Sequence, residues 1–277
     1  RGRRQALYAT YNTALSLLAL ATLKRPEDAD VMRRARQWLK AQQINARDAV
    51  SYGGFGYGSQ GGHGQGRADL SNTTLATEAM YYTEYLDREP FAPKGQEMKL
   101  AAENKQMWQA LDRFLDTCHN RTKKGDSDSA RQLRNGAFSY IPGKLMTTTS
   151  MTYAGLQSML YAKLERHDPL VRITWQFVQS NFSVDDNPGQ GMKGYYSYMH
   201  NLTRALDAYG QDTVKTQKGK TVNWRNDAIH KLAELQNDNG SWKNAEGRFM
   251  ESLPELASAY AMIGLKHALG LADLALE

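Results

Sequence analysis

A short glycine–aromatic motif recurs along the chain, and it constrains the fold more than any other feature of the sequence. Each copy is followed by a polar segment that can start a helix and then by an apolar stretch. Units of this size, repeated along a chain, indicate helical hairpins that stack or close into a ring. The three copies lie at Gly53–Gly58, Gly136–Tyr140 and Gly240–Trp242.

The segments expected to form helices alternate in character. Tyr8–Leu23 is apolar on most sides, which is typical of a buried helix, whereas Asp28–Gln43 is amphipathic and is expected to cover it. Its predicted buried stripe comprises Val31, Ala35, Trp38 and Leu39.

The same alternation continues to the end of the chain. The further inner helices are expected at Leu70–Leu86, Thr149–Leu164, Met192–Tyr209 and Leu253–Leu269, and the further outer helices at Glu97–His119, Pro169–Phe182 and Val222–Gln236. No alternating run of strand length competes, so the sequence predicts the all-α class. Because five inner helices face only four outer ones, we expect either a missing outer partner ahead of residue 1 or an incomplete ring. The prediction is one repeat domain over 1–277, truncated at its N-terminus.

Composition limits the partners of the chain. Of 277 residues, 41% are hydrophobic, which is enough for one large core, and no apolar run is long enough to span a membrane. The formal net charge is +6, but basic residues are spread along polar helix faces with acids between them, which argues against nucleic-acid binding. The compartment stays open, and secretion or a periplasmic location after removal of a signal peptide is compatible with the sequence.

The repeat resembles that of the squalene-cyclase and protein-prenyltransferase β-subunit superfamily. The loop Gly53–Gly58 with Asp69–Thr73 resembles the prenyltransferase type, and Leu235–Trp242 is close to the QW motif of the cyclases. A closer resemblance is to bacterial prenyltransferase and squalene-oxidase repeat proteins. It is carried by Ser150–Thr152, Asp185–Gly189, Tyr195–His200, Trp242 and the Arg248–Glu251 segment. The resemblance implies an α/α toroid, an incomplete barrel of inner and outer helices built from helical hairpins.

The catalytic groups of that superfamily have only partial counterparts here. Cyclases protonate an alkene with the central acid of an Asp-x-Asp-Asp motif, and the nearest segment is Ser183–Asn187, where serine replaces the first carboxylate. Asp185 is the candidate acid, and a role in helix entry is the alternative. Asp116 and Cys118 have the spacing of the prenyltransferase zinc ligands, but they lie at the end of an outer helix. We therefore expect no metal and no cofactor.

Polar residues at the N-terminal ends of the inner helices form the candidate site. In a toroid these ends surround one mouth of the central cavity, where unpaired N–H groups favour polar ligands. Tyr196 and His200 lie at i and i+4 on one helix face, and they are the candidate acid–base pair if a polar polymer is cleaved. The ligand-contacting set is Asp69, Asn72, Asp185, Asp186, Tyr196, Tyr198 and His200.

Two functions stay open at this point. One is a terpene-cyclase or prenyltransferase-like activity on an isoprenoid, which would need an aromatic and largely apolar cavity. The other is a non-catalytic or carbohydrate-active toroid that binds a glycan or peptide in a polar central cleft. The mean hydropathy of −0.65, with 15 Tyr and only 7 Phe, favours the second chemistry, whereas the resemblance favours the first.

Overall fold

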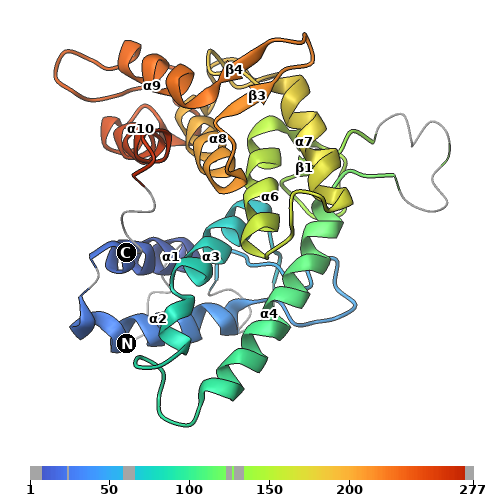
Figure 1. Cartoon of the computed structure of the whole chain (residues 1–277), viewed down its shortest axis with the longest axis vertical. Helices are drawn as coiled ribbons and strands as arrows, with labels where there is room; N and C mark the ends of the chain where they lie inside the picture. Colours follow the sequence, from blue (N-terminus) through green and yellow to red (C-terminus); the bar gives the residue numbers. More distant parts are fainter. Residues whose placement is uncertain (1–7, 24, 59–65, 123–126, 128–133, 272–277) are drawn as a thin grey trace. The chain divides into compact units, whose positions relative to one another are not determined.

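The computed structural model describes residues 8–23, 25–58, 66–122, 127 and 134–271. Helices account for 57% of the structure and strands for 5%, which confirms the all-α class. The helices follow the predicted segments closely (Figure 1). They are α1 (Ala9–Leu23), α2 (Ala29–Gln42), α3 (Leu70–Tyr82), α4 (Glu97–Cys118), α6 (Thr149–Tyr161), α7 (Pro169–Asn181), α8 (Tyr195–Tyr209), α9 (Trp224–Glu234) and α10 (Pro254–Ala268).

The contacts divide the chain into two compact units, which are described separately. Unit 1 extends to His119 and also contains Ser139–Leu145 and Tyr161–Lys163. Unit 2 contains Asn120–Phe138, Met146–Leu160 and the chain from Leu164 onward. Whether 1–277 forms one toroid domain stays a prediction.

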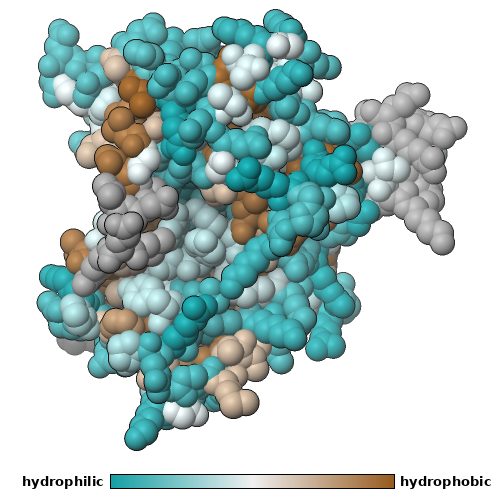
Figure 2. Space-filling model, in the orientation of Figure 1, coloured by the Kyte–Doolittle hydropathy of each residue, from teal (hydrophilic) through white to brown (hydrophobic). Residues whose placement is uncertain are grey.

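Burial separates the helices into the two predicted kinds, with α1 and α10 as partial exceptions. Ten of the 13 residues of α3 are buried, and 11 of the 15 residues of α8, as expected for inner helices. In contrast, α7 and α9 each bury three residues along one side. Only three residues of α1 and five of α10 are buried, so these apolar helices are less enclosed than we expected. Hydrophilic residues dominate the face seen in Figure 2, with hydrophobic ones gathered over α10 at the upper left.

The buried stripe of α2 differs from the predicted one. Val31 is 41% exposed, and the buried residues are Met32, Arg36, Leu39 and Gln42. Burial of Arg36 explains the rotation of the stripe, because both terminal nitrogens of its guanidinium are bound inside unit 1. It donates to Met80 O at 2.8 Å and Thr83 Oγ1 at 2.6 Å, and it forms an ion pair with Asp87. A buried charge is tolerated when it is paired in this way.

Two small strand pairs and three single turns of 3-10 helix complete the described structure. The strands β3 (Thr213–Lys215) and β4 (Thr221–Asn223) pair antiparallel, with Val214 opposite Val222. The other pair is β1 (Phe138–Ser139) with β2 (Thr147–Thr148). The 3-10 turns are η1 (Pro26–Asp28), η2 (Glu84–Asp87) and η3 (Arg248–Met250).

The aromatic residue of each glycine–aromatic loop is buried and is bound to the following helix in the same way. Its backbone N–H donates to a hydroxyl group in the second turn of that helix, so the loop and the helix start are locked together. The three bonds are Phe55 N to Thr73 Oγ1 (2.9 Å), Phe138 N to Thr152 Oγ1 (3.1 Å) and Trp242 N to Ser258 Oγ (3.0 Å).

In two of the glycine–aromatic loops, the first glycine lies directly against the next outer helix along the chain. Gly53 has φ +85°, and a Cβ there would lie 1.8 Å from Ala110 O in α4. Gly136 has φ +77°, and a Cβ there would lie 2.4 Å from the Ile173 side chain in α7. Both the backbone conformation and the close approach therefore require glycine.

Candidate functional site

The start of α3 in unit 1 contains the first two predicted site residues. Asp69 is the N-cap of α3, and its carboxylate accepts from Asn72 N at 2.9 Å and from Asn72 Nδ2 at 2.7 Å. Burial raises the pKa of Asp69, and hydrogen bonds from Asn72 and Ser71 oppose the rise. These contacts make Asp69 the cap of the helix and bind the Asn72 amide nitrogen to it.

A cluster of tyrosines surrounds this helix start. Tyr11 OH shares a hydrogen bond with Ser71 Oγ at 2.6 Å, and the Tyr57 ring stacks on Tyr11 with centroids 6.0 Å apart. Tyr57 OH and Tyr140 OH are 3.0 Å apart, and Tyr140 O accepts from Leu70 N at 2.9 Å. Burial is the main reason why the pKa of Tyr140 is raised. The cluster therefore fixes the polar end of α3 with hydroxyl groups.

The remaining five predicted residues lie in unit 2, around the start of α8. Tyr198 is fully buried and its hydroxyl donates to Ser183 O at 2.6 Å. Asp186 accepts from Ser183 Oγ at 2.7 Å, which places the side chains of Asp186 and Tyr198 around the same loop residue. Asp69 and Asn72 belong to the other unit, so the convergence of all seven residues on one rim stays a prediction.

Asp185 lies in surroundings that do not favour the proposed acid catalysis. Its side chain is 82% exposed and forms an ion pair with Lys231 at 3.5 Å. Protonation of an alkene needs an acid that is shielded from water. A catalytic role of Asp185 and the alternative role at the entry to the helix both stay predictions.

His200 and Tyr196 lie on the predicted helix, but their environments limit acid–base chemistry. The pKa of His200 is lowered to about 3 by burial and by the nearby His267, so the imidazole is neutral at pH 7. Arg204 Nη1 lies 3.2 Å from its Nε2, and the ring packs on Tyr260 with centroids 5.0 Å apart. Burial raises the pKa of Tyr196 to about 12. The pair is therefore held in its uncharged forms.

Glu251 is a buried residue that the sequence reasoning did not assign to a role. It is fully buried, and its carboxylate accepts from Ser197 N at 2.7 Å, Tyr196 N at 3.2 Å and Asn244 Nδ2 at 2.8 Å. Gly194 occupies the N-cap position of α8 and has no side chain, so Glu251 satisfies the free N–H groups instead. Burial raises the pKa of Glu251, and these hydrogen bonds oppose the rise.

The loop that delivers Glu251 has an unusual backbone. Phe249 and Met250 both have positive φ, at 57° and 61°, which L-residues other than glycine rarely adopt. Phe249 is 57% exposed, and its ring lies so close to Gly194 that a Cβ there would be 2.5 Å away. In the sequence, the only signal for this loop was that the Arg248–Glu251 segment takes part in the family resemblance.

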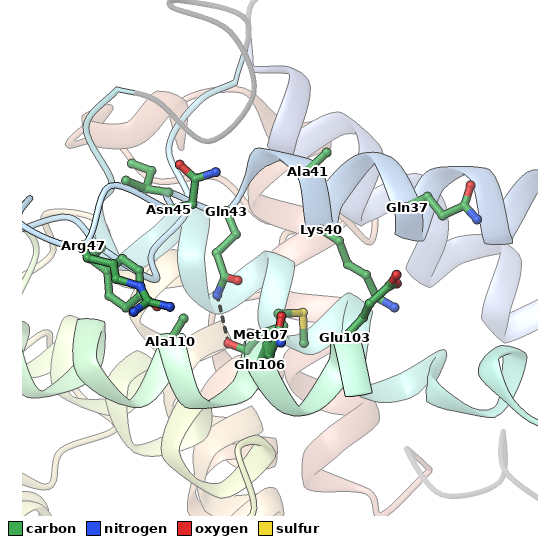
Figure 3. A pocket seen from close by; sticks show the side chains of 12 residues that line it. Gln37, Lys40, Ala41, Gln43, Asn45, Arg47, Glu103, Gln106, Met107 and Ala110 are labelled. Carbon is green, nitrogen blue, oxygen red and sulfur yellow. Dashed lines mark hydrogen bonds between the residues drawn. The ribbon is translucent and has the colours of Figure 1, made fainter. Parts of the chain in front are cut away.

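A groove of about 840 Å³ in unit 1 lies outside the predicted set. It is open to solvent and runs between α2, the loop after α2, and α4 (Figure 3). Its volume lies within the usual range of ligand pockets. The lining residues are Gln37, Lys40, Ala41, Gln43, Ile44, Asn45, Arg47, Tyr52, Glu103, Gln106, Met107 and Ala110.

Fixed polar groups divide the groove into two ends. Gln43 Nε2 donates to Gly53 O at 2.8 Å and to Met107 O at 3.0 Å, which joins the loop to α4 across the middle of the groove. In Figure 3, Lys40 and Glu103 lie at one end and Arg47 at the other. Sequence periodicity could not reveal this groove, because it needs the loop after α2 to pack on α4.

Lys40 couples the groove to the buried ion pair below it. Its Nζ lies 3.6 Å from Asp87 Oδ2, and burial lowers the pKa of the amine, although Asp87 opposes this change. Burial alone would raise the pKa of Asp87, but the charge and hydrogen bond of Arg36 lower it below its ordinary value. Asn104 Nδ2 also donates to Asp87 at 2.8 Å. One carboxylate thus holds two cations and an amide.

The described residues include no group of three His, Cys, Asp or Glu side chains placed to hold a metal ion. Asp116 and Cys118 lie in the last turn of α4, and burial raises the pKa of the Cys118 thiol, which disfavours the thiolate that binds zinc. Across the same ranges, no helix has the length and apolar character needed to cross a membrane. Neither protein-family models nor curated proteins match the chain.

Proposed function

We propose that this chain is a glycan-binding protein of the α/α-toroid type, and that its ligand lies in the groove between α2 and α4. The open polar groove is the observation that carries the proposal. The toroid arrangement is supported by the alternation of helices that bury most residues with helices that bury one side. The shared bonds of the three glycine–aromatic loops support it too.

The groove chemistry suits sugar hydroxyl groups. Amide side chains come from both walls, with Gln37 on α2 and Gln106 on α4, and an amide both donates and accepts. Tyr52 adds an aromatic ring, and Met107 and Ala110 form part of a buried apolar floor. A pyranose ring likewise combines an apolar face with a rim of hydroxyl groups.

A peptide fits this groove less well. Peptide recognition commonly uses a free strand edge, a deep apolar groove for a helix, or aromatic slots for a polyproline segment. The groove is lined by two helices and a loop, and most of its exposed residues are amides or charged groups. These features favour a glycan over a peptide as the polar polymer.

An isoprenoid substrate is the competing proposal, and it rests on the sequence resemblance. Carbocation chemistry would need a dry acid and an enclosed aromatic chamber. The exposure of Asp185 and the polar, open character of the groove both weigh against it. The same experiment therefore tests both proposals.

Binding should be measured by calorimetry against a panel of soluble oligosaccharides, with squalene and prenyl diphosphates assayed in parallel for binding and turnover. We expect a glycan to bind, and Gln106→Ala to weaken it about fivefold or more through the lost hydrogen bonds. Gln109→Ala is the matched control, because Gln109 is an exposed amide on the same helix outside the groove. Turnover of squalene or a prenyl diphosphate without glycan binding would refute the proposal.

A further inference from the structure

We infer that the groove selects an acidic glycan, and that Arg47 binds a carboxylate of a uronate residue there. The inference rests on the proposed function and names the substrate class of the same site. It is carried by the unequal charge of the two ends of the groove.

The Arg47 end of the groove carries positive charge. Arg47 and Tyr52 both line the groove, and the guanidinium of Arg113 in α4 lies 5.6 Å from the centroid of the Tyr52 ring. Throughout the part of the chain that the structure describes, neither Arg47 nor Arg113 forms an ion pair with a carboxylate. Arg47 is thus available to bind an anion in the groove, and Arg113 adds positive charge beside Tyr52.

The opposite end is closer to electrical balance. Lys40 shares the Asp87 carboxylate with Arg36, and Glu103 lies near Lys40 and 4.0 Å from Lys99. A ligand carboxylate would meet competing acids at that end. The difference between the ends would orient an acidic chain with a carboxylate at Arg47.

The residue types match a uronate. A guanidinium can bind a carboxylate through two parallel N–H···O bonds, which gives direction as well as affinity. Tyr52, in the same lining, can contact the apolar face of a sugar ring. The formal net charge of +6 would also attract a polyanionic chain from a distance.

The test compares oligogalacturonate with its fully methyl-esterified form of equal length, because esterification removes the charge and leaves the sugar rings and their linkages unchanged. Acidic oligomers of guluronate and glucuronate, with their esters, extend the panel. For at least one pair, we expect the acid to bind about tenfold or more tightly than the ester, and the difference to shrink with added salt.

Two variants test whether Arg47 causes the preference for the acidic glycan. Arg47→Gln should remove the preference for the acid while binding of the ester persists. Arg34→Gln is the matched control, because Arg34 is an exposed arginine of α2 that does not line the groove. If the ester binds as tightly as the acid, or Arg47→Gln keeps the preference, the inference is wrong and the proposed function stands. If no glycan in either panel binds, the proposed function fails as well.

Discussion

Phe138 offers a quantitative test of how the glycine–aromatic loops are held. Its ring is fully buried in unit 2 and lies on α6 at Gly155. A Cβ at residue 155 would be 2.4 Å from the Phe138 Cγ atom and within 2.6 Å of both Cδ atoms. A side chain at residue 155 and the Phe138 ring would therefore occupy the same space.

Each single substitution should destabilise the protein for a different reason. Phe138→Ala should lower the free energy of unfolding by about 3–5 kcal/mol, because it removes a fully buried ring and leaves a cavity. Gly155→Ala gains about 1 kcal/mol of helix propensity but loses about 1–3 kcal/mol to overpacking against the ring. Its net effect should be a loss of up to about 2 kcal/mol.

The double variant should be more stable than the two single effects predict. Once the ring is gone, the methyl group that Gly155→Ala adds no longer clashes and fills part of the cavity. Gly155→Ala should then be neutral or stabilising, and the interaction energy should favour the double variant by about 1–3 kcal/mol.

Urea denaturation, monitored by circular dichroism, gives the free energy of unfolding of the unaltered protein, the two single variants and the double variant. Gly264→Ala is the matched control, because its added Cβ would lie 3.5 Å from Leu232 and Thr203, an ordinary contact. It should stabilise by up to about 1 kcal/mol with or without Phe138. If the effects of Phe138→Ala and Gly155→Ala add to within about 0.5 kcal/mol, the proposed packing of the ring on α6 is refuted.

Two further predictions concern buried ionisable side chains. The lowered pKa of His200 means that its neutral form stabilises the fold above pH 6.5 and that this contribution is lost as the pH falls toward 3. When the pH falls from 7 to 5, the free energy of unfolding of the unaltered protein should therefore decrease by about 2 kcal/mol more than that of His200→Gln, as measured by urea denaturation. Equal decreases would contradict this reasoning. Asp87→Ala at pH 7 should cost about 3–5 kcal/mol by leaving the buried Arg36 unpaired. The exposed pair of Asp212 with Arg225 provides the control, since Asp212→Ala should cost under about 1 kcal/mol, and similar costs for both would argue against a buried pair.

The sequence predicted the helices well because their boundaries and faces are local properties. Asp168 followed by Pro169 marks the start of α7, and the Asp168 carboxylate accepts from Leu170 N at 2.8 Å as a helix cap. In α2, Leu39 is buried as predicted, but the burial of Arg36 was missed, because its pairing with Asp87 joins residues 51 positions apart. No local pattern reports such a partner.

The candidate sites were less predictable for the same reason. Asp69 was foreseen at the start of α3, since a helix cap needs only neighbouring residues. The groove depends on the loop after α2 reaching α4, where Gln43 bonds to Met107 over 64 positions. The role of Glu251 at α8 depends on contacts across 55 positions. Composition gave the polar character of the groove but not its place.

The cap that Glu251 provides also determines when the start of α8 can finish folding during synthesis. During synthesis, α8 leaves the ribosome well before residue 251, so the N–H groups of Tyr196 and Ser197 must first be satisfied by water. The start of α8 can reach its final hydrogen bonding only after the loop that carries Glu251 has emerged. A nascent chain halted before that loop would therefore hold α8 with its first turn unfinished.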